Sequence, residues 1–151
     1  ELLIMEGDLR RASDELIVMT DDGSYGRAGF VTHAVQELLE TRPVAQVVAI
    51  GPAIMMKMVC QVTRPHAVPT LVSLNTIMID GTGMCGGCRV SVGGKTQFVC
   101  VDGPEFDGHQ VDFDLMIRRQ AMYVEHERRA YEAYLKQHRC KLDLQMGAQS
   151  R

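Results

Sequence analysis

Several features that would assign a class of function are absent from this sequence. Lysine and arginine (16) are outnumbered by aspartate and glutamate (19), so no broad basic surface for nucleic acid is expected. No apolar run reaches the ~18 residues of a membrane-spanning helix. Tryptophan is absent and only 5% of the residues are aromatic, so we expect the ten methionines to fill gaps in a core. No signal peptide is visible and the first residue is Glu1, which suggests a piece of a longer chain.

Cysteine is present in an odd number, five, and it is clustered. A small set of this kind favours metal ligation over a disulfide framework, and it favours a reducing compartment. We therefore expect a cytoplasmic protein.

Apolar runs and helical patterns alternate over the first half of the chain. Such alternation predicts an α/β fold with right-handed crossovers and a parallel sheet. We expect strands at residues 15–20, 46–50 and 69–74, and helices at residues 1–13, 30–40, 52–63 and 112–139. The strand at 15–20 is a nearly continuous apolar run, which is typical of a strand covered on both faces.

The last predicted helix carries an apolar stripe made of Ile117, Ala121, Val124, Tyr131 and Leu135. A helix docked across the domain by this stripe is the main interpretation, and a contact with a partner subunit is the alternative. Ion pairs between Glu125 and Arg129 and between Glu132 and Lys136 would support the helix at spacing i,i+4.

Three of the five cysteines lie in residues 75–109, where Cys85, Cys88 and Cys100 follow the pattern C-x2-C-x11-C. Glycines surround the first pair, and Gly93-Gly94 marks the turn of a hairpin. Asp80 precedes Cys85 by the x4 spacing at which a plant-type [2Fe–2S] site has its first cysteine. The sequence thus predicts a [2Fe–2S] cluster held by Asp80, Cys85, Cys88 and Cys100. A zinc site, a thiol–disulfide pair and a simple turn role for Asp80 are the alternatives.

Two loops at the ends of predicted strands are candidates for binding a nucleotide. The first contains Asp21, Asp22, Gly23 and Ser24, and the second contains Gly51 and Pro52. Ligands of open α/β sheets bind at the carboxyl ends of strands, and carboxylates accept hydrogen bonds from ribose hydroxyls. A surface turn and an ordinary connector are the alternatives.

Other residues with reactive side chains receive no functional assignment. Cys60 lies in an apolar helical stretch and is expected in the core, and Cys140 has no cysteine nearby in the sequence. The histidines have no zinc-type spacing and are expected in surface or structural roles: His33, His66, His109, His126 and His138.

The runs M-C-G-G-C-R-V-S-V-G-G and F-V-C-V-D-G-P-E-F-D-G-H resemble the cluster domain of one family. This is the family of small subunits of electron-bifurcating NADH-dependent ferredoxin–NADP oxidoreductase and sulfide dehydrogenase. The electron-transfer subunit of dihydroorotate dehydrogenase is a more distant relative. Where the dihydroorotate group has a cysteine as first ligand and a cysteine before the Gly-Pro pair, this chain has Asp80 and Ile50, which favours the bifurcating group.

The resemblance implies a C-terminal part of a ferredoxin reductase-like subunit. Residues 1–75 would be part of an NAD(P)-binding module, residues 76–110 the cluster lobe, and residues 111–151 a helix and tail. It further implies an oxidoreductase subunit, inactive by itself, with NAD(H) at residues 21–24 and 51–52. FAD would be bound by a missing N-terminal domain, and a larger flavin and iron–sulfur subunit would complete a heterodimer. The alternatives are a dihydroorotate dehydrogenase electron-transfer subunit, a zinc-stabilised binding module without redox activity, and a regulatory nucleotide-binding domain that has lost its cluster.

Overall fold

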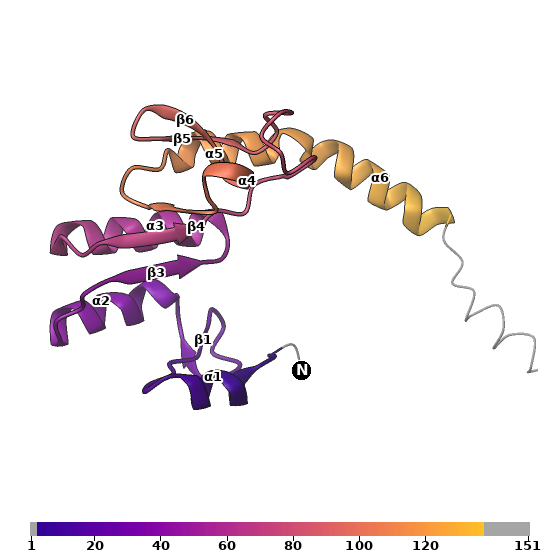
Figure 1. Ribbon diagram of the computed structural model, residues 1–151. Helices are drawn as coiled ribbons and strands as arrows, with labels where there is room; N and C mark the ends of the chain where they lie inside the picture. Colours follow the sequence, from indigo (N-terminus) through magenta and orange to yellow (C-terminus); the bar gives the residue numbers. More distant parts are fainter. Residues whose placement is uncertain (1–2, 138–151) are drawn as a thin grey trace, which may run out of the picture.

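The computed structural model describes residues 3–137, and Figure 1 shows their elements stacked along the chain from the N-terminal α1 to the projecting α6. The fold is mixed α/β with short strands. In chain order the elements are α1 (Glu6–Ala12), β1 (Met19–Thr20), β2 (Arg27–Ala28), α2 (Val31–Thr41), β3 (Val47–Ile50), α3 (Ala53–Thr63), η1 (Arg64–His66), β4 (Thr70–Ser73), β5 (Arg89–Val92), β6 (Lys95–Phe98), α4 (Val99–Asp102), β7 (Glu105–Asp107), α5 (Phe113–Gln120), η2 (Ala121–Tyr123) and α6 (Val124–Gln137).

The central sheet has the strand order β3-β4-β7. The parallel pair β3–β4, which runs from Val47 opposite Thr70 to Ile50 opposite Ser73, confirms the predicted crossover through α3. The third strand, however, is β7, which comes from the cysteine-rich segment and pairs antiparallel with β4. The sheet is therefore mixed, and it joins the first half of the chain to the second.

The prediction of a buried strand at residues 15–20 was wrong in extent and in place. Only Met19–Thr20 is a strand, it is half-buried, and it pairs in parallel with the two residues of β2 rather than with β3. The apolar run was typical of a strand covered on both faces, but within the described residues these two strands form a separate pair.

The core is assembled around α3 and β4. Among the described residues its largest fully buried hydrophobic side chains are Met56, Val72, Val99 and Met116, so it draws on α3, the central sheet, the cysteine-rich segment and α5. Two of the four are methionines, in agreement with the gap-filling role expected for this residue. Cys60 is 4% exposed in the same cluster, which confirms its placement in the core.

A buried polar chain ties the end of α3 to the cysteine-rich segment. Thr70 Oγ1 donates to Thr63 Oγ1 at 2.6 Å, and Thr63 Oγ1 lies 3.0 Å from Nε2 of His109. Arg64 also donates to the backbone oxygen of His109 at 2.6 Å. The structural role expected for His109 is therefore confirmed. Unpartnered hydroxyls in this position would be costly, because buried polar groups lose their bonds to water.

The hairpin β5–β6 is built on its turn residues. Gly93 and Gly94 both have positive φ angles, 57° and 76°, as the two central residues of a type I′ turn require. The four residue pairs from Arg89 opposite Phe98 to Val92 opposite Lys95 follow from it. The predicted hairpin is confirmed, and its two strands carry the chain from Cys88 to Cys100.

The single helix predicted at residues 112–139 is instead two helices joined by the 3₁₀ turn η2; the end of the predicted range lies outside the described residues. The helix α5 docks on the core through Phe113 and Met116. The helix α6 extends away from the body (Figure 1), and Val124, Tyr131 and Leu135 are 54%, 62% and 57% exposed. The prediction that the stripe docks across the domain was thus wrong for α6, because no other described element covers it.

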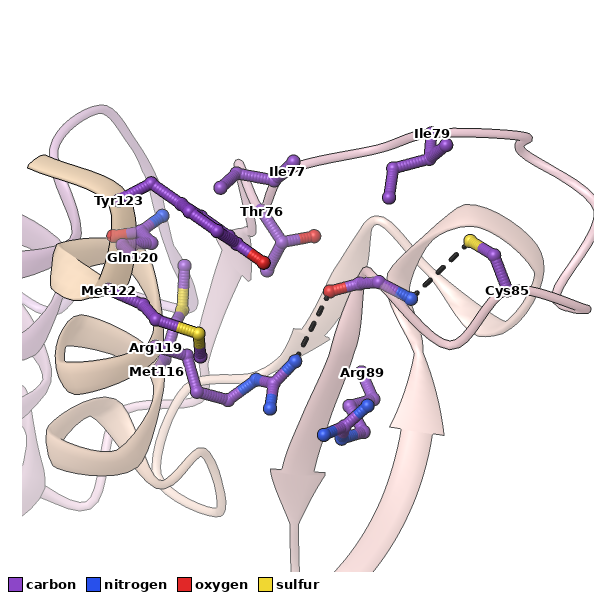
Figure 2. Close-up of a pocket in the computed structure, with 11 residues that line it drawn as sticks. Thr76, Ile77, Ile79, Cys85, Arg89, Met116, Arg119, Gln120, Met122 and Tyr123 are labelled. Carbon is purple, nitrogen blue, oxygen red and sulfur yellow. Dashed lines mark hydrogen bonds between the residues drawn. The ribbon is translucent and has the colours of Figure 1, made fainter. Parts of the chain in front are cut away.

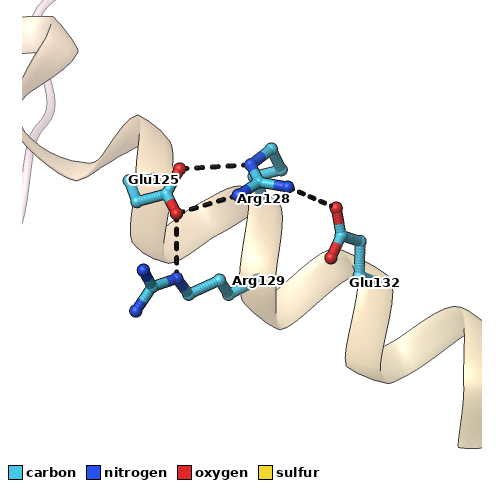
Figure 3. A network of polar contacts seen from close by, with 4 residues as sticks. All are labelled: Glu125, Arg128, Arg129 and Glu132. Atoms are coloured by element: carbon cyan, nitrogen blue, oxygen red, sulfur yellow. Dashed lines mark hydrogen bonds and ion pairs between the residues drawn. The ribbon is translucent and has the colours of Figure 1, made fainter.

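Ion pairs support α6 along its exposed surface (Figure 3). Arg128 contacts Glu125 at 2.8 Å and Glu132 at 2.7 Å, and Arg129 contacts Glu125 at 2.9 Å. The predicted pair of Glu125 with Arg129 is confirmed, whereas the side chain of Lys136 lies outside the described residues. Such exposed pairs stabilise a helix by only ~0.3–0.5 kcal/mol each. Among the described residues, no helix is long and apolar enough to cross a membrane.

Candidate iron–sulfur site

The structure brings two of the predicted ligands together, Cys88 and Cys100. Cys88 ends the glycine-rich loop just before β5, and Cys100 lies in the short helix α4 just after β6. The hairpin between them folds back, so the two Sγ atoms lie 3.2 Å apart, and the backbone N–H of Val99 donates to the oxygen of Cys88 at 3.3 Å. Cys88 is 2% exposed and Cys100 is half-buried. Two sulfur ligands are thus in place, partly shielded from water.

The contact between the two sulfurs shifts the pKa values of the two thiols in opposite directions. Burial of the Cys88 thiol opposes its ionisation, but hydrogen bonds from Cys100 outweigh burial and lower the pKa of Cys88. The hydrogen bond with Cys88 in turn raises the pKa of Cys100. The pair therefore holds one proton more tightly than the other. Thiolates, not thiols, bind metals.

Asp80 and Cys85 form a small loop of their own next to this pair. Both carboxylate oxygens of Asp80 accept backbone hydrogen bonds, Oδ1 from Thr82 at 2.9 Å and Oδ2 from Cys85 at 3.0 Å. The bond from Thr82 is the main reason why the pKa of Asp80 is lowered. Gly81 and Gly83 hold positive φ angles of 73° and 82°, which residues with a Cβ rarely adopt. The sequence therefore folds residues 80–85 into a ring closed by an ionised carboxylate.

The backbone around Cys85 also contacts its sulfur. The N–H of Gly87 donates to Cys85 Sγ at 3.4 Å, so the backbone of this turn is held against the sulfur. Cys85 is exposed, as is Asp80.

The four predicted ligands do not meet in one group. Among the residues that the structure describes, no three His, Cys, Asp or Glu side chains lie close enough to hold one metal ion. The donor chemistry nevertheless fits an iron–sulfur cluster. Three sulfur donors and a carboxylate lie on one loop and its hairpin, two of the sulfurs are 3.2 Å apart, and a Cβ added at Gly81 would meet nothing within 4 Å.

Two further side chains of the cysteine-rich segment that could serve as a fourth ligand, Asp102 and His109, have other partners. Asp102 Oδ2 accepts the backbone N–H of Phe98 at 2.6 Å, and Nε2 of His109 lies 3.0 Å from Thr63 Oγ1. Asp80 is favoured among the non-cysteine candidates by its x4 spacing to Cys85, which neither of these side chains has.

The predicted nucleotide residues lie around the exposed ends of β1 and β3. Asp21 and Pro52 line one cavity of about 490 Å³, whose other walls are largely apolar: Phe30, Val31, Ile54, Met55 and Met58, with Thr32. Asp22, Gly23, Ser24 and Gly51 do not line it. The structure therefore brings one residue of each predicted loop, Asp21 and Pro52, to the same cavity. The other four predicted residues belong to the same two loops but do not line the cavity.

Local contacts explain the shape of the two loops. The backbone N–H of Ser24 donates to Asp22 Oδ1 at 2.9 Å, and this bond lowers the pKa of Asp22. The oxygen of Gly51 accepts a bond from Asn75 at 3.4 Å, which joins this loop to the start of the cysteine-rich segment. Arg27, which begins β2 just after the first loop, pairs with Glu37 at 2.6 Å.

Sequence reasoning missed the residues that line a second cavity, of about 310 Å³, beside Cys85 (Figure 2). Arg119 and Gln120 reach it from the end of α5, and Thr76 reaches it from the segment that follows β4. Arg119 lies three residues beyond the buried Met116, so it lies on the docking face of the helix. The spacing of Arg119 from Met116 could have indicated that Arg119 faces the core. It was not used, because an arginine at the end of a polar helix usually faces solvent.

Comparison with known proteins agrees with the chemistry of this segment. Residues 75–112 match the model of the iron-sulfur cluster binding domain of dihydroorotate dehydrogenase B. An uncharacterised protein from the adh 3′ region of Clostridium beijerinckii is 51% identical over 132 residues, which are 86% of this chain and 45% of the relative. A homologue of the dihydroorotate dehydrogenase B electron transfer subunit from Thermotoga maritima is 50% identical over 136 residues, which are 90% of this chain and 48% of the relative.

A solved structure is also similar, one reported for the NADH-dependent reduced ferredoxin-NADP oxidoreductase and flavin-based electron bifurcation. It superposes with a TM-score of 0.77 at 49% identity, and the match covers 88% of this chain and 48% of that chain. The chain thus spans about half the length of the relatives it matches.

Proposed function

We propose that this chain, which is homologous to the electron-transfer subunit of dihydroorotate dehydrogenase B and to the small subunit of NADH-dependent ferredoxin–NADP oxidoreductase, transfers single electrons through a [2Fe–2S] cluster. Its ligands would be Asp80, Cys85, Cys88 and Cys100. A cluster of this type takes up and gives back one electron at a time.

The observation that carries the proposal is the Cys88–Cys100 pair. Its sulfurs are 3.2 Å apart, and the pair lies inside the segment that matches an iron–sulfur domain model. Cys85 and Asp80 follow from spacing, and the ring of bonds around Asp80 supports an ionised carboxylate at that point of the loop. Clustered free thiols of this kind favour a reducing compartment such as the cytoplasm.

The electrons would come from or go to NAD(H) bound near Asp21 and Pro52. NAD(H) exchanges a hydride, which is two electrons, so a flavin between nucleotide and cluster is needed to divide the pair. We infer that FAD is held by protein outside residues 1–151. The exposed cluster loop would then face a larger partner subunit that accepts or supplies the single electrons.

Two positions favour the bifurcating oxidoreductase group over the dihydroorotate group. Asp80 occupies the place of a cysteine ligand, and Ile50 occupies the place of the cysteine before Gly51-Pro52. Whether the partner is the ferredoxin-linked subunit or a dihydroorotate dehydrogenase subunit follows from this choice. We propose the former.

Metal content after anaerobic purification tests the proposal. The protein should be red-brown and contain about two irons per chain, without zinc. Cys88→Ser and Cys100→Ser should each abolish stable iron binding, whereas the matched control Cys60→Ala, which removes a thiol from the core, should keep it. A colourless protein with stoichiometric zinc would refute the redox function and support a zinc-stabilised module.

A further inference from the structure

Two guanidinium groups hold the two carbonyls that lie between Cys85 and Cys88. Arg89 Nη1 donates to the oxygen of Gly86 at 3.2 Å, and Arg119 Nη2 donates to the oxygen of Gly87 at 3.4 Å. Arg89 is a neighbour in sequence and is exposed, but Arg119 arrives from α5 and is half-buried. Two positive charges therefore lie against the turn that connects two predicted cluster ligands.

Gly87 has a hydrogen bond at each end of its peptide backbone, and these two bonds are the dashed lines that end at Arg119 and Cys85 in Figure 2. Its oxygen accepts from Arg119, and its N–H donates to the sulfur of Cys85 at 3.4 Å. A shift of the Gly87 backbone would thus weaken the contact with the sulfur. Arg119 acts on Cys85 through this one residue.

The helix that carries Arg119 is rigidly placed. Asp112 accepts the N–H of Leu115 at 2.9 Å as an N-cap, and Phe113 and Met116 are buried in the core. The next residue, Gln120, donates to the oxygen of Asn75 at 3.0 Å, at the beginning of the cysteine-rich segment. Two successive side chains at the end of α5 therefore brace a stretch of chain, residues 75–87, that has no helix or strand of its own.

We propose that Arg119 is a positioning residue for the cluster loop and that its charge raises the reduction potential of the cluster, an inference that rests on the proposed function. Reduction adds one electron, hence one negative charge, to the cluster. A nearby guanidinium stabilises the reduced form more than the oxidised form. Hydrogen bonds to ligand sulfur act in the same direction, and Arg119 preserves the one from Gly87.

The test is a redox titration of the cluster-loaded protein followed by electron paramagnetic resonance. Arg119→Gln should move the potential to more negative values, and Arg119→Lys, which keeps the charge, should restore part of the shift. The control Arg118→Gln removes an equal charge from the adjacent exposed position and should leave the potential close to that of the unaltered protein. Equal potentials in Arg119→Gln and Arg118→Gln would overturn the proposal.

A second measurement covers the case in which Arg119→Gln loses the cluster. Iron release to a chelator should then be several-fold faster for Arg119→Lys than for Arg118→Gln, and equal rates would contradict a positioning role.

The iron content of the unaltered protein distinguishes failure of the proposed function from failure of the positioning role. If that protein binds no iron, the proposed function fails, and hydrogen exchange of residues 85–88 decides the positioning alone: it should rise in Arg119→Gln and not in Arg118→Gln.

Discussion

The carboxylate of Asp80 accepts a hydrogen bond of 3.0 Å from the backbone N–H of Cys85, one predicted ligand bonded to the backbone of another. As a ligand, Asp80 would turn an oxygen towards iron and still be tethered to the same loop. As a turn residue, it would only shape that loop. The two roles give different results in the same set of variants.

Replacing Asp80 with cysteine separates these roles. We expect Asp80→Cys to keep about two irons per chain and to shift the reduction potential and the g-values of the reduced cluster, because ligand identity and net charge set both. Asp80→Ala should make the cluster labile. Asp80→Asn keeps an acceptor for one of the two loop bonds, so a turn role predicts that it retains the cluster better than Asp80→Ala. If Asp80→Ala left iron content and spectrum unchanged, a different fourth ligand would be needed.

Residues 1–151 alone should not oxidise NAD(P)H. None of the described side chains accepts a hydride, and the flavin is proposed to lie on other protein. Assays with ferricyanide or a viologen dye check this, with the assembled oxidoreductase as positive control. Sustained turnover without an added flavoprotein would contradict the placement of the flavin.

The full-length subunit should bind NAD(H) more tightly than NADP(H). Asp21 and Asp22 place two carboxylates at the proposed ribose site, and Arg27 is already paired with Glu37. Repulsion of a 2′-phosphate by a nearby carboxylate amounts to about 1 kcal/mol or more with screening, or several-fold in affinity. Titration with both nucleotides measures the ratio. Asp21→Asn, which neutralises the carboxylate that lines the cavity, should reduce the preference, and Asp14→Asn, outside the loop, should not; tighter binding of NADP(H) would refute the prediction.

The polar chain through Thr70 should contribute measurably to stability. Thr70→Val keeps the shape of the side chain but removes the hydroxyl that donates to Thr63. We expect a loss of about 0.5–1.5 kcal/mol in the free energy of unfolding, the net contribution of one hydrogen bond, because Thr63 Oγ1 keeps its contact with His109 Nε2. Denaturant unfolding gives this number. Thr96→Val, on the exposed face of β6, should change stability by less than ~0.5 kcal/mol and controls for the substitution itself.

The thiol of Cys60 should be unreactive in the folded protein. Burial raises the pKa of Cys60 to about 11, so at pH 8 its thiolate fraction is ~100-fold below that of an ordinary thiol. Peptide mapping after alkylation should find Cys60 unmodified under native conditions and modified in denaturant. Labelling of Cys60 at the rate seen in denaturant would mean that the packing of α3 against the sheet opens readily.

Features that depend on residues close together in the sequence could be predicted, whereas features that depend on contacts between distant segments could not. The Cys88–Cys100 pair followed from spacing and from two turn glycines, which are local signals. The exposure of α6 did not, because an apolar stripe is the same whether or not another element covers it. Arg119 was missed since its role arises only when α5 and the cysteine-rich loop meet in space. The exclusion of β1 from the central sheet likewise depends on tertiary pairing that a short apolar run does not encode.

The antiparallel pairing of β7 with β4 bears on how this protein can evolve and be engineered. Ser73 lies opposite Glu105, so the cysteine-rich segment leaves the sheet and returns to it at neighbouring positions. Because its two ends are adjacent, the segment could be inserted into another sheet as one redox module. Val90 and Val99, however, are part of the common core. A graft would therefore carry its cysteines but lose its hydrophobic support, and successful exchange between homologues should require α5 to travel with the segment.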